Sequence, residues 1–394
     1  MTEPLAGIRV LDLTNVLAGP YCCYQLALMG AEVIKVERPG GGDLARVLGA
    51  EPNRNKAGMG VSFLAQNAEK KSVTLDMKSA KGRALLKRLV QATDVLVENF
   101  RPGVMDRLGL GYNVLREVNP NLIYCAISGF GQDGPRRGDP AYDQIVQGIS
   151  GVMSITGAPD TAPYRVGYPL ADTVGGMTAA FAVSAALNAT PRGTYLDVAM
   201  SEAVISTMGW VVSNYLVGGV MPGAHGNENT TSAPSGTFAT RDNPINIAAN
   251  RDEQWQALAS HLGRDDLLSN PDYSTREDRK QNRHTLREAL EQTLRTRTAA
   301  DWVRELNAIG VPTGQVLTVP QALADEQLSG RGLIGSVQVQ GEDMKLAGSP
   351  VVMDGTRPMP KTAPPELGAD NASIWTEVGL SGAEIDTLRK EGII

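Results

Sequence analysis

A lone acid within a run of small residues is the first candidate for chemistry in this sequence. Asp172 follows an apolar run and precedes the glycine pair Gly175–Gly176, and no Lys or Arg lies between Arg165 and Arg192. The glycines predict a turn into a small-residue helix over residues 178–187. A carboxylate at that point is either the N-cap of the helix, a role that Asp favours, or a reactive group without a nearby counter-charge.

Basic side chains stand at or just beyond the ends of several predicted strands. Each alone would be a solvated surface charge, but together they could bind phosphates along one edge of a sheet. Leu75 adds an apolar side chain there and Phe100 a ring that can stack. This mixture suits a ligand with an adenine ring and several phosphates. The basic residues are Arg38, Lys78, Arg101 and Arg107.

Charge and residue types argue against several other functions. The net charge of −6 is unsuited to a nucleic-acid surface, which needs a basic field. The three histidines, His225, His261 and His284, are scattered, and the cysteines lack zinc-site spacing, so we expect no metal. No GxSxG motif supports a Ser-His-Asp hydrolase.

The same sequence predicts a cytoplasmic protein without membrane contact. No apolar run approaches the ~20 residues of a membrane helix, and the N-terminus lacks the features of a signal peptide. The three cysteines, two of them adjacent at Cys22–Cys23, make no disulfide framework.

The elements that position these residues alternate between strand and helix. Helices are predicted over residues 19–29 and 79–91. Their alternation with predicted strands implies a doubly wound, Rossmann-like α/β domain. Glu37 ends the second strand, where an acid could hold the ribose of NAD. The turn over residues 15–20, however, has no GxGxxG motif to bind the pyrophosphate. An NAD-dependent oxidoreductase is therefore the less favoured alternative. Apolar runs predict strands over residues 7–13, 31–37, 72–77, 94–98, 122–127 and 194–199.

A length of 394 residues predicts two domains. Residues 1–220 form the large α/β domain that carries Asp172. Residues 221–325 begin with a Gly-, Asn- and Pro-rich linker and then show helical apolar stripes, which predicts a small second domain. Residues 326–394 show short strands and a Pro-rich tail.

Short motifs that extend over nearly the whole chain resemble a known family. They are Leu11-Asp12-Leu13, Leu17-Ala18-Gly19-Pro20, residues 30–39, Leu75-Asp76-Met77-Lys78, residues 97–103, the Asp172 stretch, Trp255 after Asp252-Glu253-Gln254, residues 310–314, and Ala363-Pro364 with Leu367-Gly368. Together they resemble the class III CoA-transferases, a group that includes formyl-CoA and carnitine CoA-transferases. The resemblance implies that residues 326–394 return to the large domain, so that residues 221–325 form a small α+β domain inserted into it. It also implies an interlocked homodimer, in which each chain threads through the other.

The resemblance also implies roles for individual residues. Asp172 matches the nucleophile of the family, and Val16 and Leu17 match its loop near the thioester. The positions that contact CoA are matched by Arg38, Leu75, Lys78, Asn99, Phe100, Arg107 and Tyr142.

Two departures bear on the reaction. The formyl-CoA branch usually has Gln where this chain has Leu17, and its glycine run is missing near residues 229–236, which argues against formate or oxalate as the acid. Acyl-CoA racemases and epimerases of the same fold, the main alternative, need a His where this chain has Tyr142, and no His precedes residue 225.

The mechanism implied by the family is covalent catalysis by Asp172. The carboxylate, ionised at neutral pH, would take an acyl group from an acyl-CoA as a mixed anhydride and then CoA as an aspartyl thioester, before CoA passes to an acceptor acid. No permanent cofactor is expected. Backbone amides at Gly175–Gly176 or Ser235–Gly236 are candidates for an oxyanion hole. The exchanged acids remain open among dicarboxylic acids such as succinate, carnitine-like acids and aryl acids.

Overall fold

The computed structural model describes residues 3–339 and 341–394, and it divides into two compact units. Unit 1 consists of the chain up to Val152, Arg165–Val220 and Ser329–Ile394. Unit 2 consists of Met153–Tyr164 and Met221–Leu328.

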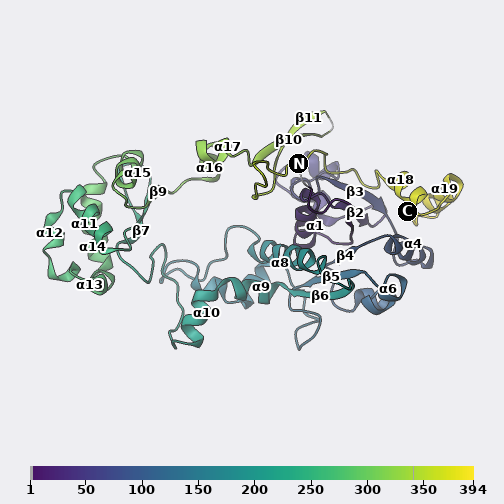
Figure 1. Cartoon of the computed structure of the whole chain (residues 1–394), viewed down its shortest axis with the longest axis horizontal. Helices are drawn as coiled ribbons and strands as arrows, with labels where there is room; N and C mark the ends of the chain where they lie inside the picture. Colours follow the sequence, from purple (N-terminus) through teal and green to yellow (C-terminus); the bar gives the residue numbers. More distant parts are fainter. Residues whose placement is uncertain (1–2, 340) are drawn as a thin grey trace. The chain divides into compact units, whose positions relative to one another are not determined.

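Unit 1 is built on a parallel sheet in the order β3-β2-β1-β4-β5-β6 (Figure 1). Five of its six strands begin and end within one or two residues of the predicted apolar runs, whereas β3 begins two residues before and ends three residues before the predicted strand 72–77. The predicted α/β fold with a parallel sheet is confirmed. Near-continuous apolar strands form where both faces of a parallel sheet are covered. The strands are β1 (Arg9–Asp12), β2 (Glu32–Glu37), β3 (Lys70–Thr74), β4 (Val95–Glu98), β5 (Ile123–Ser128) and β6 (Thr194–Ala199).

Helices cover both faces of this sheet. On one face, α1 (Ala18–Leu28) and α8 (Leu170–Ala186) pack on side chains such as Val10 and Val97. On the other face, α4 (Ala80–Gln91), α18 (Asn371–Glu377) and α19 (Gly382–Lys390) pack on neighbours such as Leu11 and Leu96. Because successive strand residues point to opposite faces, each apolar strand contributes to both cores.

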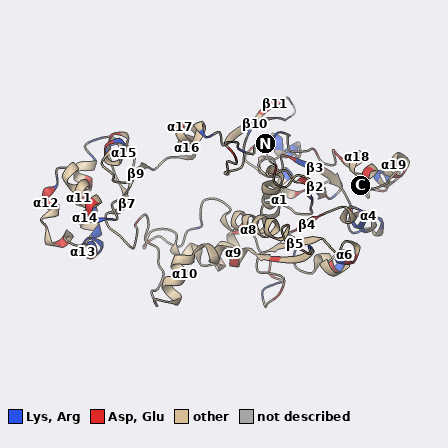
Figure 2. Ribbon diagram, viewed as in Figure 1, with Lys and Arg blue, Asp and Glu red and all other residues tan. Residues whose placement is uncertain are grey.

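Helix α8 differs from the outer helices in its charge. Asp172 is its only charged residue, so the helix stays tan in Figure 2, whereas α4 carries several basic residues. Its small side chains let it pack closely against α1, which lies beside it in Figure 1.

The C-terminal segment closes the outer edge of the sheet at β3. The carboxylate of Asp370 accepts a hydrogen bond from the Ser72 amide at 2.8 Å, and the Asn371 side chain accepts one from the Thr74 amide at 2.8 Å. These side chains take the place of a further strand and satisfy edge amides that would otherwise need water.

Shorter elements complete unit 1 and its connections to unit 2. A hairpin of β10 (Ile334–Val339) and β11 (Glu342–Ala347) packs against Phe63. The helices are η1 (Leu44–Val47), α2 (Pro52–Lys56), α3 (Val61–Leu64), α5 (Val104–Arg107), α6 (Tyr112–Val118), α7 (Asp143–Ile149), η2 (Val152–Ile155), α9 (Met200–Thr207), α10 (Gly209–Leu216), α16 (Val319–Ala324) and α17 (Glu326–Gly330).

Unit 2 has its own core. An antiparallel sheet in the order β7-β8-β9 packs against helices whose predicted stripes, including Trp255, Leu290 and Trp302, are buried. The strands are β7 (Ser235–Phe238), β8 (Ile245–Ala248) and β9 (Thr313–Gln315). The helices are α11 (Asp252–His261), α12 (Asp265–Leu268), η3 (Pro271–Tyr273), α13 (Arg276–Gln281), α14 (Arg283–Leu294) and α15 (Ala299–Ala308).

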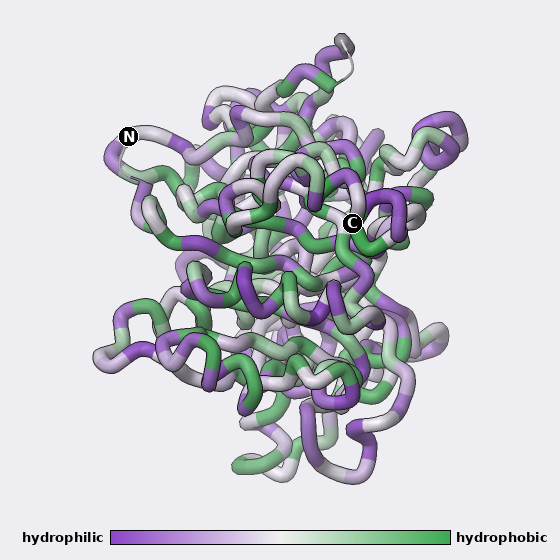
Figure 3. The backbone as a smooth tube through the Cα atoms, turned by 90° about the vertical axis from the view of Figure 1, so that its right-hand side faces the viewer, coloured by the Kyte–Doolittle hydropathy of each residue, from purple (hydrophilic) through white to green (hydrophobic). Residues whose placement is uncertain are grey.

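Hydrophobic and hydrophilic residues alternate at short intervals along the chain (Figure 3). Among the described residues, no helix is long and apolar enough to cross a membrane.

Candidate active site

Asp172 lies in the first turn of α8, which begins at Leu170. Pro169 occupies the N-cap position, so the interpretation of Asp172 as the helix N-cap is wrong. Within the described residues, no side chain or backbone group donates a hydrogen bond to the Asp172 carboxylate. The carboxylate is therefore held by its backbone alone, near the positive end of a 17-residue helix.

Gly175 and Gly176 lie inside α8, not in a turn before it. Their amides belong to the hydrogen-bond ladder of the helix, so this pair cannot form the expected oxyanion hole. The glycines allow close packing instead. A Cβ on Gly176 would lie 2.4 Å from the carbonyl oxygen of Ala18, and one on Gly175 would lie 2.7 Å from the side chain of Met200. The other proposed oxyanion pair, Ser235–Gly236, lies in β7 of unit 2.

A cavity of about 350 Å³ opens beside Asp172 within unit 1. It forms at the carboxyl ends of β1, β4 and β5, where ligands of open α/β sheets bind. Met200, at the start of α9, also lines it. The predicted site residues that the cavity brings together are Val16, Leu17, Asn99, Phe100, Arg101, Tyr142 and Asp172.

The other predicted site residues lie outside this lining. All three basic residues among them are exposed. Arg38 follows β2, Lys78 follows β3, and Arg107 lies in α5. The strands are parallel, so the residues that follow β2, β3 and β4 share one edge of the sheet with the cavity. Leu75 is buried in the core with only 2% of its surface exposed, and its amide donates a hydrogen bond to the Glu37 carbonyl oxygen.

The environment of Asp172 changes its acidity. Burial raises the pKa of its carboxyl, and the negative charge of Asp143 raises it further, to about 7. The expectation that this group is fully ionised at neutral pH is therefore wrong. A carboxylate with little hydration and no hydrogen-bond donor is a stronger nucleophile than one in water, provided that it is deprotonated.

Asp143, which the sequence analysis missed, holds the start of α8. Its Oδ1 accepts a hydrogen bond from the Ala171 amide at 2.8 Å, and its Oδ2 accepts one from the Gln147 side chain at 2.8 Å. The Gln147 amide group also contacts the preceding loop, donating to the carbonyl oxygen of Tyr168 and accepting from the Val166 amide. Helix α7 thus fixes the backbone on which Asp172 stands. The position of Asp143 directly after Tyr142 was the available signal.

A strained loop also lines the cavity. Val16 has a φ of 68°, which a β-branched residue rarely adopts. Its amide donates to the Asp43 carboxylate at 2.9 Å. Asn99 holds Asn15, the residue before Val16. The Asn99 side chain accepts a hydrogen bond from the Asn15 amide at 2.9 Å and donates one to the Asn15 carbonyl oxygen at 2.8 Å. These bonds hold a conformation that would otherwise relax, as is common near functional sites.

A buried ion network lies beneath this loop. Lys35 contacts the Asp43 carboxylate at 2.9 Å and donates to the Thr14 carbonyl oxygen at 2.9 Å. Lys70 contacts the Asp12 carboxylate at 2.9 Å. Burial alone would raise the pKa of Asp12, but the charges of Lys35 and Lys70 outweigh it and bring the pKa to about 2.

No group of His, Cys, Asp and Glu suited to a metal ion occurs in the described part of the chain.

The comparison with protein families identifies the chain. A family model described as CoA-transferase family III matches residues 5–371. The chain belongs to CoA-transferase family III. This confirms the resemblance found in the sequence, and it makes the protein a CoA-transferase that uses CoA thioesters as substrates.

Several characterised or solved proteins are similar over most of their length. An acetyl-CoA:oxalate CoA-transferase from Acetobacter aceti is 38% identical over 88% of this chain and 90% of its own. A succinate–glutarate CoA-transferase from Agrobacterium fabrum is 35% identical over 95% of this chain and 96% of its own. The crystal structure of a CAIB/BAIF family protein from Brucella suis has a TM-score of 0.84 and 34% identity, covering 96% of this chain and 100% of that one.

We predict that CoA transfer depends on an ionisation near pH 7, set by Asp172. Because its pKa is raised to about 7, the reactive anion is lost as the pH falls through that value. The rate should drop about tenfold per pH unit on the acidic side. Initial rates measured between about pH 5 and pH 9 test this.

Asp143→Asn sharpens the test. It removes the neighbouring negative charge while its Oδ1 can still accept from the Ala171 amide, so the acidic limb should move to lower pH. Glu117→Gln, on the exposed surface of α6, is the matched control and should leave the profile unchanged. An acidic limb that lies at the same pH in Asp143→Asn as in the wild type would contradict the claim that the Asp143 charge raises the pKa of Asp172.

Asn99→Ala should loosen the strained loop. Two hydrogen bonds to the backbone of Asn15 are lost, which should lower the free energy of unfolding by about 1–3 kcal/mol. Since Val16 and Leu17 line the cavity, the KM for acyl-CoA should also rise. Asn15→Ala keeps both backbone partners and should stay within about 0.5 kcal/mol of the wild type. Equal losses in both variants, measured by urea denaturation, would show that the clamp is not the cause.

Proposed function

We propose that this protein transfers CoA from an acyl-CoA to a carboxylic acid through covalent intermediates on Asp172. The observation that carries the proposal is the state of that side chain: a desolvated carboxylate without a hydrogen-bond donor, lining a cavity at the carboxyl edge of the sheet.

Each step of this reaction exchanges one bond for another. A carboxylate oxygen of Asp172 attacks the thioester carbonyl carbon, and the CoA thiolate leaves, which gives a mixed anhydride. The thiolate then attacks the aspartyl carbonyl carbon and displaces the donor acid. An acceptor carboxylate attacks the resulting aspartyl thioester and releases the thiolate again. Finally, the thiolate attacks the acyl carbon of the new anhydride and restores Asp172.

The chain supplies position and partial exclusion of water to these steps. The Val16–Leu17 loop, Phe100 and Tyr142 line the same cavity as Asp172. We assign the ADP portion of CoA to the basic edge beyond the strands, which carries Arg38, Lys78 and Arg107. Guanidinium and ammonium groups there would pair with its phosphates.

The acceptor is proposed to be a short dicarboxylic acid. The similar proteins named above act, by their names, on oxalate or on succinate and glutarate. Leu17 stands where the formyl-CoA branch has Gln, which favours an acid larger than oxalate.

We also propose that the protein works as an interlocked homodimer. Helix α10 is apolar over most of its length, yet none of its residues is buried. Trp210 is 84% exposed, and Val217, directly after the helix, is 88% exposed. Phe181 on α8 adds a further exposed ring. Single exposed apolar residues are normal, but a cluster of large ones marks an interaction surface.

The central prediction concerns Asp172→Asn. This change keeps the size of the side chain and removes the anionic nucleophile, so transfer should fall by at least about 10³-fold while the fold remains intact. Circular dichroism and a coupled assay with succinyl-CoA and glutarate provide the two measurements.

Trapping tests the covalent intermediate directly. Wild-type protein incubated with acyl-CoA and hydroxylamine should acquire a hydroxamate at Asp172, as located by mass spectrometry. Modification at another residue would contradict the assignment. Solvent deuterium at the α-carbon of the acyl group, without any acceptor acid, would instead indicate a racemase.

The dimer makes a separate prediction. Trp210→Glu places a charge within the exposed apolar surface and should shift the protein toward a monomer in sedimentation equilibrium. Lys56→Glu, on the charged helix α2, is the control and should leave the mass unchanged. A wild-type protein that sediments as a monomer would rule out the interlocked arrangement.

A further inference from the structure

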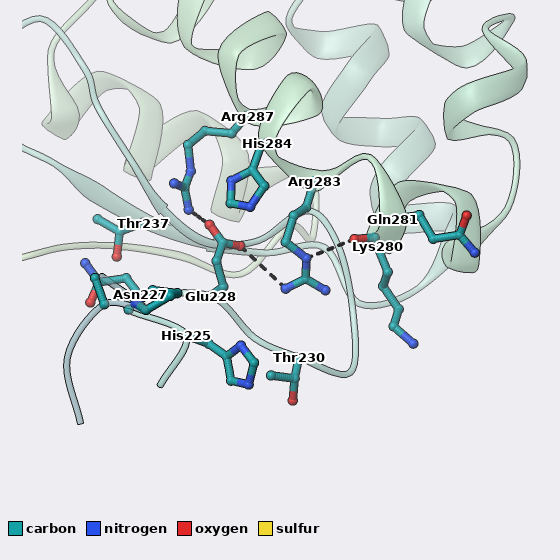
Figure 4. Close-up of a pocket in the computed structure, with 13 residues that line it drawn as sticks. His225, Asn227, Glu228, Thr230, Thr237, Lys280, Gln281, Arg283, His284 and Arg287 are labelled. Carbon is teal, nitrogen blue, oxygen red and sulfur yellow. Dashed lines mark hydrogen bonds and ion pairs between the residues drawn. The ribbon is translucent and has the colours of Figure 1, made fainter. Parts of the chain in front are cut away.

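A second cavity, of about 710 Å³, lies within unit 2 (Figure 4). The loop of residues 225–230 forms one side, and the end of α13 with the start of α14 forms the other. Thr237 of β7 also lines it. None of these residues has a role in the reaction proposed above.

The charges in this cavity are not balanced. Lys280, Arg283 and Arg287 line it, whereas Glu228 is the only acid in the lining. Glu228 is shared, because its carboxylate contacts Arg287 and lies 3.9 Å from Arg283 (Figure 4). Lys280 pairs with Glu277, which is not part of the lining. Positive charge therefore remains in excess inside the cavity.

The two guanidinium groups are also largely removed from water. The side chain of Arg283 is 16% exposed and that of Arg287 is 29% exposed. Burial lowers the pKa of Arg283, and the Nε of Arg287 is buried without a hydrogen-bond partner among the described residues. A desolvated cation with an unused donor is costly unless an anion completes its contacts.

The helix geometry adds to this potential. Arg283 is the first residue of α14, a 12-residue helix without an acid in its first turn. The N-terminal end of a helix carries a partial positive charge, so cations there are unfavourable and anions are favoured. Figure 2 shows the basic residues that gather on α13 and α14.

We propose that this cavity binds a carboxylate of a small dicarboxylic acid. The assignment rests on the proposed function, which supplies such an acid as substrate. A planar guanidinium matches a carboxylate with two parallel hydrogen bonds. Thr230 and the ring nitrogens of His225 and His284 can complete the contacts to the remaining oxygens. The volume is ample for a chain of a few carbon atoms.

Calorimetric titration of glutarate into the full-length protein, without CoA, tests the site. Wild-type protein should bind glutarate more tightly than glutaramide, which has no carboxylate. Arg287→Gln should weaken glutarate binding by about tenfold or more. Arg276→Gln changes the charge equally on exposed α13 surface outside the cavity, and it should bind as the wild type does.

Glu228→Gln gives an independent result in the opposite direction. It removes the carboxylate that pairs with Arg287 and lies 3.9 Å from Arg283, so glutarate should bind several-fold more tightly. Unchanged affinity in both Arg287→Gln and Glu228→Gln would overturn the proposal. Binding of inorganic phosphate or adenosine 3′,5′-bisphosphate that Arg287→Gln abolishes, with no glutarate binding, would overturn the carboxylate assignment in favour of the phosphates of CoA.

Asp172→Asn separates this inference from the proposed function. The variant should lose CoA transfer and still bind glutarate with the wild-type affinity. If Asp172→Asn remained active while Arg287→Gln lost binding, the mechanism would be wrong and the cavity assignment would stand.

Discussion

The buried ion network at the ends of β1 and β2 is the constraint on which the active site depends. Asp12, Lys35, Lys70 and Asp43 are fully shielded from water, and their charges are compensated mainly by one another, with hydrogen bonds to backbone groups and to the side chains of Thr14 and Asn67. Removing one partner would leave an uncompensated buried charge, at a cost of about 3–5 kcal/mol. The network thus tolerates little displacement. Because Asp43 also accepts from the Val16 amide, it transmits this rigidity to the strained loop.

Asp172, the proposed nucleophile, lines the same cavity as this loop but stands on a helix that is positioned independently. Asp143 and Gln147 on α7 fix the entry to α8, and Gly175 and Gly176 bring α8 close to α1 and α9. Two effects then oppose each other at Asp172. The helix dipole favours the anion, whereas burial and the charge of Asp143 favour the protonated acid. Burial and the Asp143 charge have the larger effect, so the pKa is raised. The anion of Asp172 is therefore weakly stabilised, and its negative charge is readily lost when a carboxylate oxygen forms a covalent bond.

Sequence patterns predicted those parts of the fold that depend on local chemistry. Apolar runs located the strands of unit 1, and the stripe of Leu286, Leu290 and Leu294 located α14, because burial of one face imposes a period on the sequence. The predicted residues at the strand ends, such as Asn99 and Phe100, meet in one cavity since parallel strands end at one edge.

The remaining features required three-dimensional information. Gly175–Gly176 was interpreted as a turn because glycine is most often a helix breaker, but here it permits close packing between helices. The bond from Ala171 to Asp143 links residues 28 positions apart, and no local pattern encodes it. The pKa of Asp172 likewise follows from what surrounds the side chain and not from its neighbours in sequence. The left-handed Val16 contradicts its own backbone preference and is imposed by tertiary contacts.

The closure of β3 by Asp370 and Asn371 has a consequence for how the protein is made. The Ser72 amide donates to Asp370, which lies 298 positions later in the chain, and the Thr74 amide donates to Asn371, which lies 297 positions later. During synthesis, the strand is therefore complete long before its outer edge can be covered. An uncovered strand edge is a template for pairing with other chains. Contacts over such long sequence separations also form slowly. The edge of β3 therefore stays open to pairing with other chains until residues 370 and 371 have been synthesised and have folded against it.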